Sequence, residues 1–278
     1  MEITYEEFIQ CCPAGEVPDT VIFESIGAQL QRWKNWARKL ATPPIYDGLD
    51  KIDAGPVTED YDRLVTLRRY LVGMICSLAF EDAIPQLDLV LTPTGFGVVS
   101  NQNVAPASVD RVNALKTRMH NQGWLYFEEA LDVLRYLGAP ETSKLCASAF
   151  KTLFWKSGHL NVFGIPNPAH DNLLEKNHDI LAEQPFLIRF ISPEQFEAFM
   201  KAESSATTTP LQWVVIQMCR VYFATEGTIA KNAQKLAILN FMEQHPEDFP
   251  EYMKSETFKA NHFQRYENQK DDPCFFFG

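Results

Sequence analysis

The sequence predicts a mainly α-helical protein, built as one or two helical bundles with a single β-hairpin inserted between two long helices. Over most of the chain, apolar residues recur at spacings of three and four, which is the period of an amphipathic helix. Between residues 84 and 108 this period gives way to alternation and turn residues. Twenty Phe and five Trp among 278 residues supply enough large apolar side chains for a packed core or an interface.

Two long helices are expected before the hairpin. The first spans Thr20–Leu40, where an apolar stripe recurs at spacings of four and three until Pro43 and Pro44 end it. The second begins after Thr58, with acidic residues in its first turn, and continues to about Glu81. Its apolar face is broad, so we expect this helix to be buried on more than one side.

The hairpin is expected at residues 86–100. Leu87, Leu89 and Leu91 alternate with other residue types, as in a half-buried strand. Pro93-Thr94-Gly95 supplies a turn, and Phe96–Ser100 supplies the returning strand. An isolated hairpin is marginally stable in water, so we expect this one to dock on another surface.

Two more helices are expected before the middle of the chain. Ser108 is placed to cap the first of them, which continues until Gly138 and Pro140. Gly123, in its middle, indicates a kink or a point of close packing. A further amphipathic helix is expected around Glu141–Trp155.

Glycine and proline interrupt the pattern between Ser157 and His170, which predicts a boundary between residues 1–157 and 158–278, although the two regions could form one domain. In the second region, Ser192-Pro193 and Thr209-Pro210 each combine an N-cap residue with a first-position proline. Helices are expected from Pro210 to about Thr225, and from after Gly227 to about Gln244.

The charge and the cysteines exclude several classes of protein. A net charge of −11 argues against a protein that clamps nucleic acid or binds an anionic membrane surface. No apolar run reaches the ~20 residues that span a bilayer, and the first ten residues carry no basic segment of a secretory signal. We therefore expect a cytoplasmic protein. Its six scattered cysteines are expected to be reduced, with Cys76, Cys146 and Cys219 acting as small core residues.

A search for reactive constellations predicts no catalytic, cofactor-binding or metal-binding residue. No histidine pair has the HExxH or zinc-finger spacing, and no serine or cysteine lies in a nucleophile motif. His170 and His178 could share a helix face, but such a pair is more typical of a solvated surface. Glu128-Glu129 is likewise typical of a charged exterior, and the basic clusters at residues 32–39 and 68–69 are expected on solvated helix faces.

One set of segments resembles a known family. The segment DLVLTPTGFGVVSNQNVAPASVDRV, the preceding LRRYLVGMICSLAFEDAIPQL, the N-terminal VIFESIGAQLQRWKNWARKL and the C-terminal FMEQHPEDFPEYMKSETFK…YENQKDDPCFFFG are similar to an uncharacterised family from phages and prophages of gut anaerobic bacteria. The resemblance is thinner between about Gly138 and Phe190. It implies a structural role in the virion neck, as an adaptor-like subunit in a ring around the portal exit. It brings no catalytic residues.

This resemblance leads to a functional hypothesis: a non-enzymatic head–tail connector that is made in the bacterial cytoplasm and ends in the virion. Its expected partners are further copies of itself and other virion proteins such as portal or tail components, with DNA at most passing through an acidic lumen and no membrane. Candidate subunit contacts are apolar residues of the hairpin and of the C-terminal tail: Leu89, Leu91, Phe96, Val98, Phe275, Phe276 and Phe277.

Two alternatives remain open. The protein could be a helical interaction or regulatory module of a mobile element, which would also need no catalytic motif. It could also be an enzyme whose site escapes recognition, and then Asp88, His120 and Glu128 would be the reactive groups nearest to the hairpin.

Overall fold

A computed structural model of the protein describes residues 1–12, 21–54, 60–87, 89–92, 95–98, 108–201 and 208–262. The chain divides into two compact units, unit 1 (Met1–Asn177) and unit 2 (His178–Gly278). The division falls inside a helix, α9 (His170–Ile191), and not at the residue 157/158 boundary expected from the sequence. The two units are therefore described separately.

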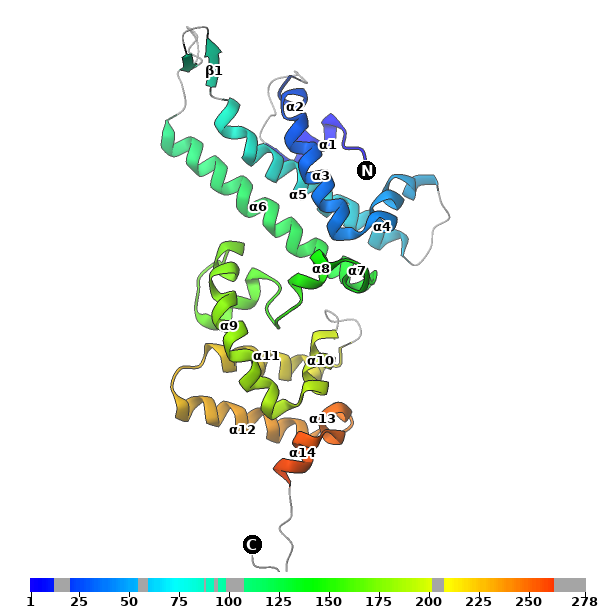
Figure 1. Ribbon diagram of the computed structural model, residues 1–278, viewed down its shortest axis with the longest axis vertical. Coiled ribbons are helices and arrows are strands. Elements are labelled where there is room, and N and C mark those ends of the chain that lie inside the picture. Colours follow the sequence, from blue (N-terminus) through cyan, green and yellow to red (C-terminus); the bar gives the residue numbers. More distant parts are fainter. Residues whose placement is uncertain are drawn as a thin grey trace, which may run out of the picture. The chain divides into compact units, whose positions relative to one another are not determined.

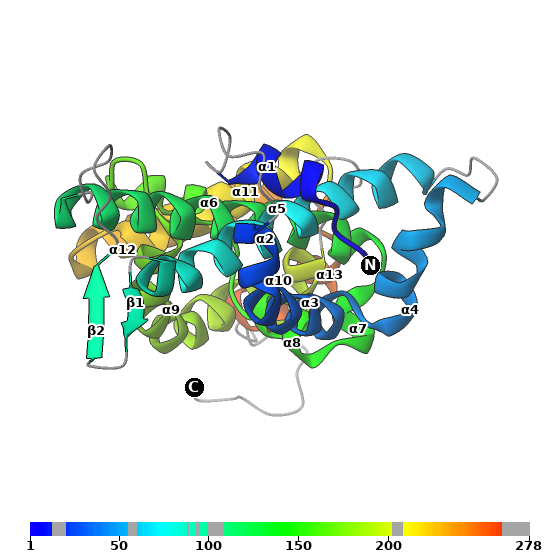
Figure 2. The same cartoon turned by 90° about the horizontal axis from the view of Figure 1, so that it is seen from above.

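Unit 1 is built around two long helices, α5 (Tyr61–Leu87) and α6 (Val109–Tyr136), which pack on each other along their lengths. Figures 1 and 2 show α5 between α6 and α3 (Gly27–Ala41). Shorter elements complete the unit: α1 (Tyr5–Cys11), α2 (Val21–Ser25), α4 (Pro43–Gly48), η1 (Leu49–Ala54), α7 (Ala139–Thr142), α8 (Lys144–Ala149), η2 (Ser157–Phe163) and the first turns of α9.

The centre of α5 is the core of unit 1. Every residue from Leu71 to Phe80 is buried, which confirms that this helix is covered on more than one side. Gly123 of α6 lies against this segment: a Cβ atom there would come within 2.5 Å of Cγ of Leu78. The expected close packing point at Gly123 is thus confirmed, and it lets α6 approach α5 closely.

The fold class predicted from the sequence requires a correction in its β part. Because α5 and α6 pack directly on each other, no β layer lies between them, and the protein is helical. Two four-residue segments, β1 (Leu89–Thr92) and β2 (Gly95–Val98), pair only with each other. Helix α5 also continues to Leu87, into the segment where alternation had predicted a strand. The predicted fold class, a helical bundle with an inserted hairpin over residues 86–100, is therefore corrected to a helical fold in which these two short segments pair outside the helices.

Two expected helices are broken. The segment Thr20–Leu40 forms α2 and α3, which are separated at Ile26, a residue only 1% exposed. The segment Glu141–Trp155 does not form one helix, because Ser143 has extended backbone angles between α7 and α8. The Ser143 hydroxyl accepts the N–H of Cys146 and donates to the carbonyl of Lys39, and this capping arrangement replaces a helical turn.

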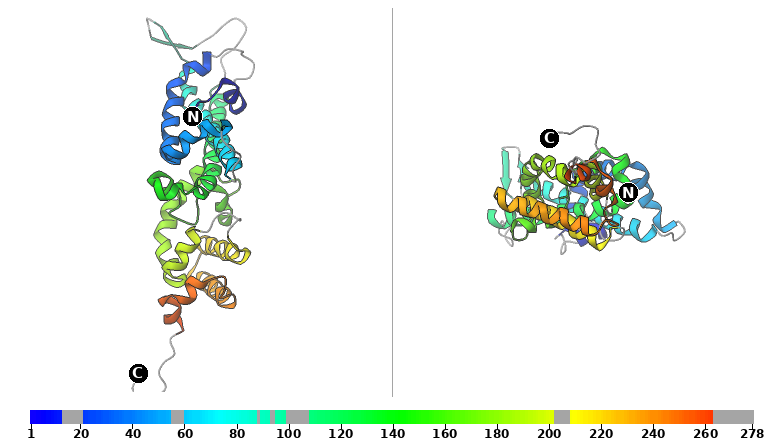
Figure 3. Two further views of the ribbon diagram at one scale, coloured as in Figure 1. Left: turned by 90° about the vertical axis from the view of Figure 1, so that its right-hand side faces the viewer. Right: turned by 90° about the horizontal axis from the view of Figure 1, so that it is seen from below.

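Unit 2 consists of the remaining turns of α9 and five further helices: α10 (Pro193–Lys201), α11 (Pro210–Ala224), α12 (Thr228–Gln244), α13 (Pro250–Lys254) and α14 (Glu256–Asn261). Helices α11 and α12 lie side by side (Figures 1 and 3). The starts expected at Ser192 and Thr209 are confirmed, since each side chain accepts a backbone N–H of its helix. Thr209 and Gln212 form a complete capping box.

Unit 2 is held together by polar side chains as well as by its core. The Gln212 side chain donates to the carbonyl of Asp248 at 2.9 Å, and the buried Gln195 side chain accepts the N–H of Tyr252 at 3.1 Å. These two bonds join the helix starts at α10 and α11 to the segment around α13. Arg220 of α11 is 1% exposed, and burial lowers its pKa to about 9.

Candidate functional site

The most concentrated group of polar and aromatic side chains in unit 1 lies on one face of α6. His120, Trp124 and Glu128 follow one another at intervals of four residues, so they share that face. Ser108 caps helix α6, and its hydroxyl accepts the N–H of Arg111. The cap expected from the sequence is thus confirmed, and it fixes the start of the helix.

Glu128 is the centre of the site. Its side chain is 2% exposed, and its Oε2 accepts both the N–H and the hydroxyl of Ser157, at 2.9 and 2.8 Å. Its Oε1 lies 2.8 Å from Nδ1 of His170. A buried carboxylate is costly unless several donors compensate for the lost water. Glu128 therefore ties α6 to the starts of η2 and α9.

The imidazole ring of His170 packs against aromatic side chains, in addition to its contact with Glu128 at Nδ1. The ring stacks on Trp124 with centroids 4.5 Å apart and an interplanar angle of 4°, and it meets Phe127 edge to face. Trp124 in turn contacts Trp33 and Trp36 of α3 in edge-to-face geometry. These five rings join α3, α6 and α9, and we call them the aromatic cluster.

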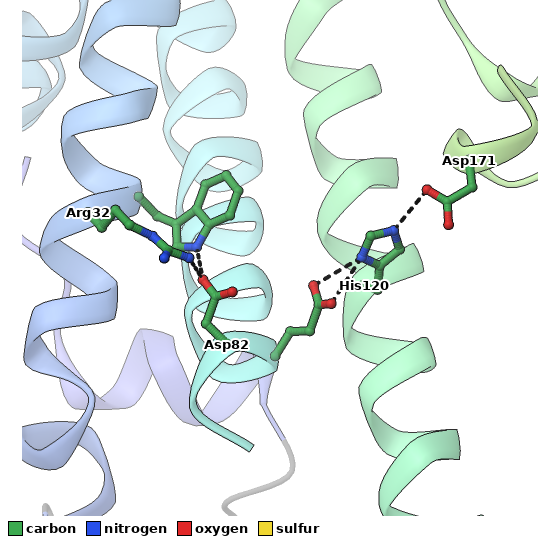
Figure 4. A network of polar contacts seen from close by, with 6 residues as sticks. Arg32, Asp82, His120 and Asp171 are labelled. Carbon is green, nitrogen blue, oxygen red and sulfur yellow. Dashed lines mark hydrogen bonds and ion pairs between the residues drawn. The ribbon is translucent and has the colours of Figure 1, made fainter. Parts of the chain in front are cut away.

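A second polar network lies about two turns from Glu128, toward the N-terminus of α6 (Figure 4). His120 Nδ1 is 3.1 Å from both carboxylate oxygens of Glu81, and its Nε2 is 3.1 Å from Oδ1 of Asp171. Burial disfavours the charged imidazole, but the hydrogen bond with Asp171 and the charge of Glu81 outweigh it, so the pKa of His120 is raised. Asp82, next along α5, accepts Nε1–H of Trp33 at 2.6 Å and pairs with Arg32.

A third ion-pair network lies on the other side of Glu128. Lys156 Nζ is 2.5 Å from Asp132 and 3.1 Å from Glu129. Burial opposes the charged form of Lys156, but these two carboxylates outweigh it and raise its pKa. Asp132 also accepts Nε1–H of Trp155 at 3.2 Å. The segment after α8 is therefore fixed to α6 by charge as well as by packing.

The aromatic cluster borders a cavity of about 180 Å³. Aromatic and aliphatic side chains form most of its wall, and Ser148 and Asn177 add polar groups. Its lining includes Trp124, Phe127, Phe154, Trp155, His170, Leu173 and Leu174. Glu128 and Ser157 are absent from that lining, so the bonded carboxylate does not face the cavity.

The arrangement of Ser157, Glu128 and His170 is not that of a catalytic triad. In a triad the hydroxyl is hydrogen-bonded to the imidazole, which removes its proton. Here the hydroxyl of Ser157 and the imidazole of His170 both bond to the same carboxylate. Among the described residues, no group of three or more His, Cys, Asp or Glu is arranged to hold a metal ion. The geometry fits a clamp between segments better than a reaction centre.

The sequence-based expectations for these side chains were partly wrong. Glu128 was expected on a charged exterior and His170 on a solvated helix face, but Glu128 is buried and His170 is partly buried against it. His178 does lie at the surface, with a side chain 92% exposed. Of the three groups named for an unrecognised enzyme site, His120 and Glu128 belong to different networks, and Asp88 lies outside the described residues. The sequence did not reveal the clamp formed by Glu128, Ser157 and His170, because Ser157 and His170 lie 29 and 42 residues after Glu128.

Three of the six basic residues expected on solvated faces form ion pairs, and the paired Arg32 and Arg38 are exposed as expected. Arg38 forms two bonds with Asp47, and Arg68 pairs with Glu7 of α1. Cys76, Cys146 and Cys219 are fully buried, which confirms their expected place in the core. The candidate subunit contacts Leu89, Leu91, Phe96, Val98 and Phe275–Phe277 have side chains outside the described residues.

Comparison with known proteins gives one partial match. Residues 38–143 match the model of a family described as a family of unknown function (DUF6712). The matched segment contains α5 and α6 with His120 and Glu128, but not Ser157 or His170. No curated protein and no solved structure matches the chain. No helix in the described part of the chain is both long and apolar enough to cross a membrane. The chain is thus similar, over its two longest helices, to a family without an assigned activity.

Proposed function

We propose that the protein is a non-enzymatic structural subunit of a phage or prophage virion, acting in the neck that joins head and tail. It assembles there with further copies of itself and with portal or tail components. The proposal starts from the resemblance of several segments to a phage-borne family. The observation that carries it is an exposed apolar stripe along α12 of unit 2.

The stripe consists of apolar residues on one face of α12. Ile229 is 88% exposed and Leu236 is 59% exposed, and Ala233 is exposed between them. Ala230 and Ala237 widen the stripe, and no charged residue interrupts it. The exposed face of a surface helix is normally polar. An apolar face of this kind is therefore typical of a surface that is covered in an assembly.

The neighbouring helix α11 also exposes apolar side chains. Val214 and Val221 of α11 are 41% and 40% exposed, and α11 packs directly on α12. We assign a second copy of this chain to the surface. Each copy carries a net charge of −11, so copies repel one another at long range. An uncharged stripe is the kind of surface on which such copies can meet without bringing like charges into contact.

The polar groups of unit 1 support the non-enzymatic part of the proposal. The Glu128 carboxylate accepts bonds from two segments, and the hydroxyl of Ser157 donates to it. Groups engaged in this way stabilise the fold and are not poised to react with a substrate. The acidic charge also fits a lumen through which DNA passes without binding.

Sedimentation velocity of the full chain over a range of concentrations tests the proposal. We expect a mass that rises with concentration for the wild type, and a monomer for the double variant Ile229→Glu/Leu236→Glu. Ala28→Glu/Ala260→Glu is the matched control, because it adds the same two negative charges at exposed positions of α3 and α14. It is expected to associate like the wild type.

A wild type that stays monomeric at every concentration would overturn the proposal, as would equal association of the stripe variant. Affinity capture from infected cells distinguishes the alternative: portal or tail proteins support the neck, whereas a host regulator as the sole partner would indicate a regulatory module.

A further inference from the structure

Three cysteines from two distant parts of the sequence meet in unit 1. Cys11 is the last residue of α1, Cys12 caps that helix, and Cys76 lies in the middle of α5. Sγ of Cys12 donates to the carbonyl of Cys76 at 3.4 Å, and the interaction of Cys11, its neighbour in the chain, with the thiol of Cys76 lowers the pKa of Cys11. Helix α1 packs on α5 at this point.

The three thiols differ in access. Cys12 is 3% exposed and Cys76 is fully buried, so a dissolved reagent does not reach them directly. Cys11 is only partly buried and lines a cavity of about 470 Å³ that also contains Gln10, Arg68 and Arg69. Cys11 is therefore the thiol of the group that a small molecule can approach.

The three thiols also differ in reactivity. The hydrogen bond from Cys76 lowers the pKa of Cys11, against the opposing effects of burial and of Glu7. Burial raises the pKa of Cys12 well above its usual range. The hydrogen bond with Cys11, together with burial, does the same for Cys76. The thiolate is the nucleophile, so the accessible thiol is also the one that is most readily ionised.

We propose that Cys11 is a redox modification site whose substrate class is a peroxide, and that Cys76 resolves the oxidised form into a disulfide joining α1 to α5. The Cys11 thiolate attacks one peroxide oxygen, which breaks the O–O bond. This step yields a sulfenic acid and, after protonation of the leaving oxygen, water or an alcohol. The sulfur of Cys76 then attacks the sulfenic sulfur, and the hydroxyl leaves as water with the thiol proton. Two thiols are oxidised and one peroxide is reduced.

Geometry favours Cys76 over Cys12 as the resolving thiol. Adjacent residues joined by a trans peptide have Cα atoms ~3.8 Å apart, whereas unstrained disulfides need roughly 4.4–6.8 Å. The described peptide bonds include no cis bond, so a Cys11–Cys12 disulfide would be strained. Cys76 lies on a different helix and is not restricted in this way.

A Cys11–Cys76 disulfide would close the loop that contains α2, α3 and α4. A cross-link over a loop of this length stabilises a fold chiefly by restricting the unfolded chain. The bond would stay open in a reducing cytoplasm and close in an oxidising environment. This inference does not depend on the proposed function, because it concerns only the chemistry of unit 1.

The test is oxidation of the full chain carrying Cys274→Ser, with graded hydrogen peroxide, followed by thiol counting and mass spectrometry of the digest. We expect the loss of two thiols and one cross-linked peptide pair containing Cys11 and Cys76. Cys12→Ala should retain that cross-link, while Cys11→Ser and Cys76→Ala should each lose it. Circular dichroism shows whether each variant is folded. If Cys76→Ala does not fold, loss of the cross-link in Cys11→Ser remains the test.

A second readout is thermal unfolding. The oxidised chain should unfold at a higher temperature than the reduced chain, and a reductant should abolish the difference. The inference is overturned if the oxidised digest links Cys12, if Cys146 or Cys219 reacts first, or if Cys11 is oxidised to sulfinic acid without a cross-link.

Discussion

Large apolar side chains are placed differently in unit 1 and in unit 2. In unit 1 the Trp side chains of α3 and α6 are packed on one another, on His170 and on α5, and the exposed apolar residues are scattered over several helices. In unit 2 the two most exposed apolar residues, Ile229 and Leu236, follow one face of α12, while other exposed apolar residues lie on α9 and α11. Scattered apolar residues are normal at a surface, whereas an ordered stripe indicates a contact.

The same contrast holds for charged residues. Unit 1 buries a carboxylate, Glu128, and supplies it with three hydrogen bonds. The stripe of unit 2 has no charged residue at all. In unit 1, polar groups thus hold segments of the same chain together. In unit 2, the α12 stripe, where we expect another copy to bind, contains no charged group. Four perturbations test this difference, beginning with the one of largest expected effect.

Replacing Glu128 with Ala should destabilise unit 1 most. The change leaves the N–H and hydroxyl of Ser157 and the imidazole of His170 without their acceptor in a buried setting. We expect the free energy of unfolding to fall by ~3–5 kcal/mol, the usual cost of breaking a buried charged network. Denaturant unfolding measures it. Glu129→Ala is the control, because its carboxylate is 40% exposed and should cost no more than ~1 kcal/mol. Equal losses would show that Glu128 is not the centre of a clamp.

Substitutions at two nearby positions on α12 distinguish a core residue of unit 2 from a residue of the exposed stripe. Ile238 is fully buried, so Ile238→Ala should lower the free energy of unfolding by ~2–5 kcal/mol. Leu236→Ala should change the stability of the monomer by only about 0.5 kcal/mol, because its side chain is already exposed. Chemical denaturation at low protein concentration is the measurement. A large loss for Leu236→Ala would place that residue in the core of unit 2 and remove it from the interface.

Gly123→Ala tests the contact between α5 and α6. The added methyl group would lie within 2.5 Å of Leu78, which is 1% exposed and cannot move into solvent. Overpacking of this kind costs ~1–3 kcal/mol, against the ~1 kcal/mol that Ala gains in helix propensity, so we expect a net loss of up to ~2 kcal/mol. Gly27→Ala is a matched helical control with no atom within 4 Å of the new group, and it should be neutral or stabilising. Thermal melting of both variants is the readout, and equal effects would contradict the close approach.

The smallest effect is a dependence on pH. The folded-state pKa of His120 is raised, so its stabilising contribution is complete below the unfolded-state pKa and is lost as pH rises through the folded-state pKa. The stability difference between wild type and His120→Gln should therefore be larger at about pH 5.5 than at about pH 8.5. Urea titrations at both values measure it. A difference that grows with pH would show that Glu81 and Asp171 do not favour the charged imidazole.

Local features of the sequence predicted local structure well. The caps at Ser108, Ser192 and Thr209 are present because capping depends on a few adjacent residues. The break at Ser143 was not predictable, because the hydroxyl also donates to Lys39, 104 residues away in the sequence. Glu128 was assigned to the surface for the same reason: its burial depends on Ser157 and His170. Alternation at residues 87–91 predicted a strand at Leu87, but α5 continues to that residue, whose side chain is exposed.

We expect α12 of unit 2 to be covered by another copy, whereas the core of unit 1 is complete by itself. Hydrogen–deuterium exchange of the full chain at low and high protein concentration tests it most directly. Raising the concentration should slow exchange in α11 and α12 and leave α5 and α6 unchanged. Exchange in α12 that is independent of concentration, or new protection confined to unit 1, would contradict the claim.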